Sequence, residues 1–254
     1  MTGPLTGYRV IDFTNVIAGP YATMILADQG ADVIKVEAPH RPDHTRHAGP
    51  GNTGMTASFV NNNRNKRSIS IDLKSDEGCE ALKRLVATAD VFIQNFRPGV
   101  VERLGIGEDD LRAVKPDLIY VSMSGWGENG PLSHKPVYDP IIQALSGLAT
   151  VQAGSDEKRP RLIRTILPDK LTGVTAAQAV VAALAGRAKS GEGQHVKVSM
   201  LDSIIAFLWS PDMGGQTFIG KEMSDQRAAT FIDLIYETKT DYITISTMTN
   251  VQWE

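Results

Sequence analysis

Short apolar runs alternate with longer amphipathic stretches along most of the chain. The apolar runs predict strands at residues 8–13, 32–37, 67–73, 91–94, 118–124 and 195–200. Capping residues and helical spacing predict helices between them, at 21–29, 75–88, 99–104, 108–114, 140–148, 169–187 and 201–210. Strands that alternate with helices form crossover units, so we expect an α/β fold with a doubly wound, mostly parallel, Rossmann-like sheet. In such sheets ligands bind beyond the carboxyl ends of the strands.

Residues 1–200 are expected to form this α/β large domain. Residues 201–254 are expected to hold a linker helix and the beginning of a smaller second domain. Within that part, 241–247 is predicted as a strand and 250–254 as the first residues of a helix. The chain ends there without a capping signal, which predicts that the second domain is truncated.

Asp169 is the strongest candidate for chemistry. It follows Pro168, which disfavours a helix before it, and it precedes a helix rich in glycine and alanine. We therefore expect the helix to begin at or just after Asp169, where unpaired N–H groups and the helix dipole would keep the carboxylate ionised. An ionised carboxylate can attack an activated carbonyl. The alternative is that Asp169 only caps the helix, because aspartate is common at that position.

Composition narrows the range of partners. The formal net charge of −3 over 254 residues argues against a nucleic-acid partner. Cys79 is the only cysteine, which excludes an intrachain disulfide and fits a reducing cytoplasm. The chain shows neither a secretory signal nor an apolar stretch judged long enough for a bilayer, so we expect a cytoplasmic protein with no membrane partner. Pro39 and Pro42 disfavour a helix around His40, His44 and His47, so the spacing of these histidines does not place them on one face. They are therefore not expected to bind a metal.

Cations and amides gather in residues 61–68 (NNNRNKRS), just before a predicted strand. Lys74 and Arg103 add positive charge near the expected ligand edge. In an acidic protein this grouping favours a polyanionic small molecule, and a solvated turn is the alternative. Residues 125–130 match G-x-G-x-x-G, but the prolines that follow prevent the helix that a dinucleotide fingerprint must open. A nicotinamide cofactor is therefore not expected.

Short motifs are spread over nearly the whole chain. They are RVIDFT (9–14) with AGP (18–20), GADVIKVE (30–37), NKRSI (65–69), DLK (72–74), NFRPG (95–99), RLG (103–105), SGWG (124–127), YD (138–139) with QALSG (143–147), and GEGQ (191–194). In this order and spacing they closely resemble the class III coenzyme A transferases, the family of formyl-CoA transferase and carnitine CoA-transferase. Each motif is weak alone, and the resemblance rests on the set.

The resemblance implies transfer of CoA from an acyl-CoA donor to a carboxylic acid acceptor. Asp169 would attack the thioester to form a mixed anhydride, and then carry CoA as an aspartyl thioester. No cofactor would be tightly bound, because coenzyme A and acyl-CoA are substrates. The partners would be these small molecules and a second copy of the chain, since the family forms interlocked homodimers. Arg46, Lys66 and Arg67 are further candidates for the phosphate or adenine end. CoA contacts would fall on Val16, Ile17, Ala18, Leu73, Lys74, Asn95, Phe96, Arg97, Arg103 and Tyr138.

Three positions depart from the family pattern and leave alternatives open. Ile17 stands where formyl-CoA transferase has glutamine, and Ala38 where it has arginine, which argues against oxalate or formate as substrate. Tyr138 stands where the racemase branch has its histidine, which argues against racemisation because tyrosine is a poor base near neutral pH. An acyl-CoA racemase, with Asp169 removing the α-proton, is one alternative. A catalytically silent CoA-binding fragment is the other.

Overall fold

A six-stranded parallel sheet organises the protein. The computed structural model describes residues 2–52, 54–154, 157–209, 212–220 and 234–245. The strand order is β5-β2-β1-β6-β7-β8, and every neighbouring pair is parallel. These strands are β1 (Arg9–Phe13), β2 (Asp32–Glu37), β5 (Lys66–Ser70), β6 (Val91–Gln94), β7 (Ile119–Ser124) and β8 (His195–Ser199). Numbered along the chain, the order is 3-2-1-4-5-6, which confirms the doubly wound α/β prediction.

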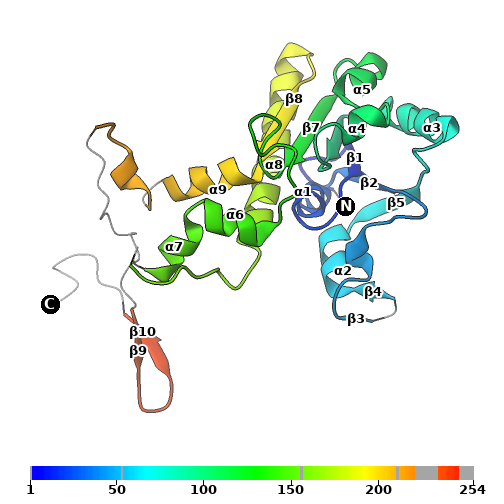
Figure 1. Ribbon diagram of the computed structural model, residues 1–254. Coiled ribbons are helices and arrows are strands. Elements are labelled where there is room, and N and C mark those ends of the chain that lie inside the picture. Colours follow the sequence, from blue (N-terminus) through cyan, green and yellow to red (C-terminus); the bar gives the residue numbers. More distant parts are fainter. Residues whose placement is uncertain (1, 53, 155–156, 210–211, 221–233, 246–254) are drawn as a thin grey trace.

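Helices cover both faces of the sheet (Figure 1). One face carries α1 and α8, and the other carries α3, α4 and α5. Helix α8 forms from a stretch rich in glycine and alanine, and α3 forms from an amphipathic stretch. The helices are α1 (Ala18–Asp28), α2 (Ala57–Asn63), α3 (Asp76–Val86), α4 (Val100–Arg103), α5 (Glu108–Val114), α6 (Asp139–Leu145), α7 (Leu148–Ala153), α8 (Leu167–Ser190) and α9 (Met200–Trp209).

The strands divide their side chains between two cores. In β1, Val10 packs in the core beneath α1 and α8, whereas Ile11 packs in the core beneath α3 to α5. The same alternation in β6 sends Val91 and Ile93 to the first core and Phe92 to the second. Successive side chains of a strand point to opposite faces, so a sheet that is covered on both sides needs nearly continuous apolar runs. This is why the strands can be located from sequence.

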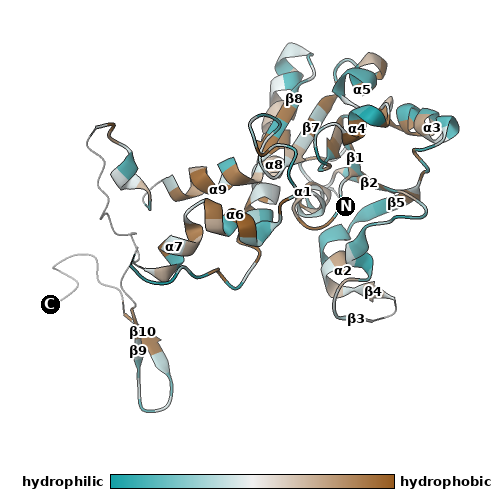
Figure 2. Cartoon of the chain, viewed as in Figure 1, coloured by the Kyte–Doolittle hydropathy of each residue, from teal (hydrophilic) through white to brown (hydrophobic). Residues whose placement is uncertain are grey.

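A third apolar cluster extends away from the sheet. It is formed by α6, α7 and α9 and includes the buried residues Ile142, Leu148, Ile204 and Leu208. Figure 2 shows α6 and α9 in brown, whereas α3 on the opposite side of the molecule is mainly teal. The division into domains at residue 200 stays a prediction, and α9 begins at that residue.

The two helices on the first face pack unusually closely. At Gly173 of α8, an added Cβ would lie 2.8 Å from the carbonyl oxygen of Ala18 and 2.9 Å from the Tyr21 ring. Contrary to the sequence prediction, α8, with 24 residues, is long and apolar enough to span a membrane by length and composition alone; 39% of its apolar window is buried within the protein. Its buried stripe packs on α1 and on the sheet, as core helices of this length do.

Buried ion pairs hold the first half of the sheet together. Lys66 Nζ donates to Asp12 Oδ2 at 2.9 Å, and it also donates to the carbonyl of Pro20 and to Asn63. Burial would raise the pKa of Asp12, but Lys66 and Lys35 lower it to about 2. Burial also lowers the pKa of Lys66 to about 8. A buried pair of this kind costs desolvation, so its complete set of hydrogen bonds is what makes it tolerable.

Several boundaries differ from the sequence predictions. Helix α1 begins three residues earlier than expected, at Ala18, and β5 ends at Ser70 rather than 73. Helix α2 was not predicted, because it is short and ends in a polar run of three asparagines; at its other end, Thr56 caps it by accepting from the Phe59 N–H. In the expected strand 241–247, Tyr242–Thr244 forms β10 and pairs with β9 (Ile235–Glu237). The helix expected at 250–254 lies outside the described residues.

The packing at Gly173 leads to a stability prediction. Gly173→Ala should lower the free energy of unfolding by about 1–3 kcal/mol, because the new methyl group must push against the α1 backbone. Gly186→Ala in the same helix is the matched control, since its Cβ would meet only Gln194 Nε2 at 3.4 Å. Alanine is the better helix former, so the control should be neutral or gain up to about 1 kcal/mol. Urea denaturation measures both, and equal effects would contradict the close packing.

Candidate active site

The switch point of the sheet lies between β1 and β6, where the strand order reverses. Both strands end at the same edge, and the loops that follow them are joined by two hydrogen bonds. The Asn15 N–H donates to Asn95 Oδ1 at 2.8 Å, and Asn95 Nδ2 donates to the Asn15 carbonyl at 2.8 Å. Phe96 then packs on Phe13, with ring centroids 4.7 Å apart. In open α/β sheets the crevice at this point is where ligands bind.

The turn after β1 has a strained backbone. Val16 adopts φ +71°, a left-handed conformation that β-branched residues rarely take. Its N–H donates to Asp43 Oδ2 at 3.1 Å, and Asp43 also faces Lys35 Nζ at 3.4 Å. Lys35 in turn donates to the carbonyl of Thr14 at 2.8 Å. These buried polar groups fix a conformation that would otherwise relax, and such strain is concentrated at functional sites.

Asp169 lies at the same edge of the sheet. Helix α8 begins at Leu167, two residues before the predicted start, so Pro168 and Asp169 belong to its first turn. The N-cap is Ile166, and no side chain caps the helix. The capping role considered for Asp169 is therefore excluded. Asp169 is 9% exposed, and its carboxylate faces the backbone N–H of Ala18, at the beginning of α1, which lowers its pKa.

A second buried carboxylate stands beside Asp169. Asp139, the first residue of α6, accepts a hydrogen bond from the Asp169 N–H at Oδ2, at 3.2 Å. Its Oδ1 accepts from Gln143 Nε2 at 2.6 Å. Gln143 Nε2 also donates to the Thr165 carbonyl, and Gln143 Oε1 accepts from the Ile163 N–H. The segment that leads into α8 is therefore tied to α6. The sequence analysis included Tyr138 and Asp139 in a motif but gave Asp139 no role.

The environment raises the pKa of Asp169 to about 6. Burial is the main cause, the negative charge of Asp139 adds to it, and the hydrogen bond from Ala18 opposes both. Burial also raises the pKa of Asp139, while Gln143 and the Asp169 N–H act against that rise. The helix start was expected to keep Asp169 ionised; burial and Asp139 raise its pKa, but the value stays below neutral pH, so the carboxylate is mostly ionised there.

The other predicted contact residues occupy the same edge at different distances from Asp169. Val16, Ile17 and Ala18 form the turn and first residue of α1, next to Asp169. Asn95 and Phe96 lie across the switch point, and Arg97 is exposed beyond them. Tyr138 is 63% exposed and precedes the buried Asp139.

The remaining predicted contacts lie farther from Asp169 along the sheet. Leu73 is buried and Lys74 exposed after β5, which lies two strands from β1, or roughly 10 Å. Arg103 is the last residue of α4 and is exposed. No hydrogen bond described in the structure joins these three residues to Asp169.

Three candidate cations are already engaged in structural contacts. Lys66 is buried against Asp12, as described above. Arg67 pairs with Asp32, its Nη2 lying 2.6 Å from Oδ2. Arg46 pairs with Glu37 at 2.6 Å and lies over the Phe59 ring. The cation cluster of residues 61–68 therefore stabilises the fold, because the contacts that occupy it come from residues distant in sequence.

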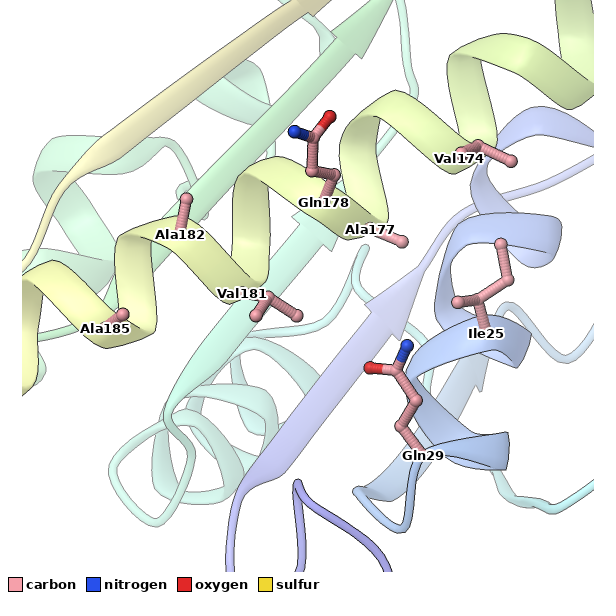
Figure 3. Close-up of a pocket in the computed structure, with 8 residues that line it drawn as sticks. All are labelled: Ile25, Gln29, Val174, Ala177, Gln178, Val181, Ala182 and Ala185. Atoms are coloured by element: carbon pink, nitrogen blue, oxygen red, sulfur yellow. The ribbon is translucent and has the colours of Figure 1, made fainter.

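An apolar groove runs between α1 and α8 (Figure 3). It has a volume of about 470 Å³, and Asp169 does not line it. Ile25 and Gln29 of α1 form one wall. The other wall comes from α8, with Val174, Ala177, Gln178, Val181, Ala182 and Ala185. In the described part of the chain, no group of three or more His, Cys, Asp or Glu side chains is arranged to hold a metal ion.

Comparison with known proteins defines the class to which this fold and site belong. The model of CoA-transferase family III matches residues 5–254, and the chain belongs to that family. The acetyl-CoA:oxalate CoA-transferase of Acetobacter aceti is 45% identical over 209 residues, covering 81% of this chain and 53% of that protein. The succinyl-CoA:glutarate CoA-transferase of Mus musculus is 36% identical and covers 98% of this chain and 58% of that protein. The chain thus spans about half the length of these curated relatives.

A solved structure supports the same assignment. A CAIB/BAIF family protein from Brucella suis superposes with a TM-score of 0.88 at 33% identity. The match covers 100% of this chain and 68% of that protein. The family resemblance inferred from the motifs is confirmed.

The raised pKa of Asp169 predicts how stability varies with pH. The carboxyl binds its proton more tightly when folded than when unfolded, so its contribution is fully favourable below pH 4 and is lost as pH rises through about 6. Asp169→Asn, which stays neutral, should gain about 2–3 kcal/mol over the unchanged protein at pH 8. The gain should disappear below pH 4. Urea denaturation across this range measures it, and a gain independent of pH would contradict the assignment.

Proposed function

We propose that this protein transfers CoA from an acyl-CoA to a carboxylic acid, with Asp169 as the nucleophile. The supporting observation is the position of its carboxylate, buried at the first turn of α8 and facing the N–H of Ala18 at the start of α1. A carboxylate whose pKa is raised to about 6 is more nucleophilic than an ordinary aspartate, yet it is mostly ionised at neutral pH. Membership of CoA-transferase family III supports the same reaction class.

The proposed reaction proceeds by four exchanges at carbonyl carbons. An Asp169 oxygen attacks the thioester, the C–S bond breaks, and CoA thiolate leaves a mixed anhydride. The thiolate attacks the aspartyl carbonyl and releases the donor acid, which leaves an aspartyl-CoA thioester. The acceptor carboxylate attacks this thioester, releasing thiolate and forming a second anhydride. The thiolate then attacks the acceptor carbonyl, which gives the new acyl-CoA and frees the Asp169 carboxylate.

The surrounding groups suit this chemistry. The Ala18 N–H, at the positive end of the α1 dipole, can donate to an oxyanion at the aspartyl carbonyl. We propose that CoA lies along the carboxyl edge of the sheet, between Val16, Ile17 and Ala18 on one side and Asn95 and Phe96 on the other. Lys74, Arg97, Arg103, Leu73 and Tyr138 would contact its more distant parts.

The acceptor is proposed to be a dicarboxylic acid. Oxalate, glutarate and L-malate appear in the names of the matching relatives from Acetobacter aceti, Mus musculus and Chloroflexus aurantiacus, although Ile17 and Ala38 argue against oxalate itself for this chain. We further propose a cytoplasmic homodimer that binds CoA as substrate without a tightly bound cofactor. The apolar groove between α1 and α8 is the surface we assign to the second copy, because it leaves Val174 and Val181 partly exposed.

The covalent step predicts a severe loss in Asp169→Asn. Transfer should fall by at least about a thousandfold, since the amide cannot form the anhydride. The affinity for CoA should stay within about threefold of the unchanged protein, because the variant keeps the shape of the side chain. Radiolabelled acyl transfer and calorimetry with CoA measure the two effects.

Trapping with hydroxylamine separates this mechanism from its rivals. After incubation with acyl-CoA, mass spectrometry should find a hydroxamate on Asp169 and none in Asp169→Asn. Exchange of the α-proton with deuterated water, without an Asp169 adduct, would instead identify a racemase. CoA binding with neither adduct nor exchange would identify a silent CoA-binding protein.

Asp139 should control the pH dependence of transfer. Asp139→Asn removes the negative charge that helps raise the pKa of Asp169 and leaves one oxygen, which can accept from either the Asp169 N–H or Gln143 Nε2. The acid limb of kcat/KM, expected near pH 6 in the unchanged protein, should therefore move to lower pH. Asp202→Asn, which changes an exposed carboxylate in the first turn of α9, is the matched control and should leave the limb in place. An unmoved limb in Asp139→Asn would contradict the coupling.

A further inference from the structure

A chain of hydrogen bonds crosses the second half of the sheet, outside the site described above. Glu108 Oε2 lies 2.6 Å from His195 Nδ1, and His195 Nε2 lies 2.8 Å from Ser122 Oγ. Gln94 Nε2 donates to the same Ser122 oxygen at 3.1 Å. The Phe96 N–H donates to Gln94 Oε1 at 2.7 Å. This series of hydrogen bonds therefore runs from α5 through β8, β7 and β6 to the loop beyond β6.

The donors and acceptors in this chain determine one another. An ionised Glu108 can only accept, so His195 carries a hydrogen on Nδ1, and in the neutral ring Nε2 is then an acceptor. The Ser122 hydroxyl then donates to His195 while its oxygen accepts from Gln94. The Gln94 amide is fixed from both sides, with Nε2 donating to Ser122 and Oε1 accepting from the Phe96 N–H. The hydrogen bonds thus connect His195 to the backbone at Phe96.

Neighbouring side chains hold the members of this hydrogen-bond series in place. The ring of Tyr120 meets His195 edge-on, with centroids 5.1 Å apart, and Arg112 Nη1 bonds to Glu108 Oε1 at 3.0 Å. Ser122 and Gln94 are both buried, and they face each other across the β6–β7 ladder. Breaking one bond would leave a buried polar group unsatisfied, which costs more than the bond itself contributes.

The arrangement of serine, histidine and glutamate resembles a hydrolytic triad, but its surroundings favour a different role. Ser122 lies inside β7 and is buried, whereas a nucleophilic serine must be exposed to its substrate. Its oxygen already accepts from Gln94, and its proton is directed at His195. The chain leads instead to Phe96, whose neighbour Asn95 bonds to Asn15 across the switch point.

We propose that His195, acting through Ser122 and Gln94, is a positioning residue for the loop of Asn95, Phe96 and Arg97, and thereby for CoA. The effect on CoA binding rests on the proposed function, whereas the positioning of the loop rests on the hydrogen bonds alone. The hydrogen-bond series holds the wall of the switch-point crevice at Phe96, while the Asp43–Lys35 pair holds the other wall at Val16.

Amide exchange at Phe96 and CoA affinity, the second read out by calorimetry and by transfer kinetics, test the proposal in the purified protein. Ser122→Ala and His195→Leu should each speed amide hydrogen exchange at Phe96 by about three- to tenfold, because the Gln94 amide loses its fixed orientation. Both should weaken CoA binding by a similar factor, measured by calorimetry. In transfer assays, KM for acyl-CoA should rise while kcat stays within about twofold. His195→Gln, which can accept from Ser122 and donate to Glu108, should restore most of both properties.

A matched control and distinct outcomes separate the positioning of the loop from its effect on CoA binding. Ser203→Ala removes a half-buried hydroxyl of α9, one that bonds to the Ser199 carbonyl at the end of β8, and it should change neither property. Unchanged exchange at Phe96 in correctly folded Ser122→Ala and His195→Leu would overturn the positioning role. Faster exchange with unchanged CoA affinity would overturn its link to the ligand. If the unchanged protein bound no CoA, the proposed function would fail, while the exchange data would still decide the positioning role.

Discussion

The close approach of α1 and α8 at Gly173 is the constraint on which the candidate site depends. Because no side chain separates the two helices there, the backbone N–H of Ala18 reaches the buried carboxylate of Asp169. A buried carboxylate without a donor would be strongly disfavoured. The missing side chain at one position of α8 therefore permits the charge at another, one turn earlier in the same helix.

The resulting site balances two opposing effects on Asp169. Burial and the neighbouring Asp139 favour the protonated carboxyl, and the Ala18 N–H favours the ionised one. The outcome, a pKa of about 6, leaves a carboxylate that is charged near neutral pH and more basic than a solvated aspartate. Such a group suits attack on a thioester, since nucleophilicity rises with basicity as long as the charged form predominates.

The sequence allowed the sheet to be predicted well and the site only in part. Strands such as β6 are continuous apolar runs, because both faces of the sheet are covered, and this pattern is local and readable. The surroundings of Asp169 are not local, since Asp139 lies 30 residues away and Ala18 comes from the first helix. Lys66 illustrates the same limit: it resembled a phosphate ligand in sequence, but its partner Asp12 lies 54 residues away. Only the folded chain reveals that this charge is already neutralised.

These contacts also indicate where positive charge remains for a polyanionic ligand. Lys35, Lys66 and Arg46 are used to hold the strained turn at Val16 and the strands beneath it. Lys74, Arg97 and Arg103 are exposed cations that follow β5 and β6, and Lys170 is exposed directly after Asp169. A ligand whose reactive end lies at Asp169 and whose phosphates lie near these residues must extend along the edge of the sheet. The proposed substrate, an acyl-CoA, has this extended shape, with phosphates at one end and a thioester at the other.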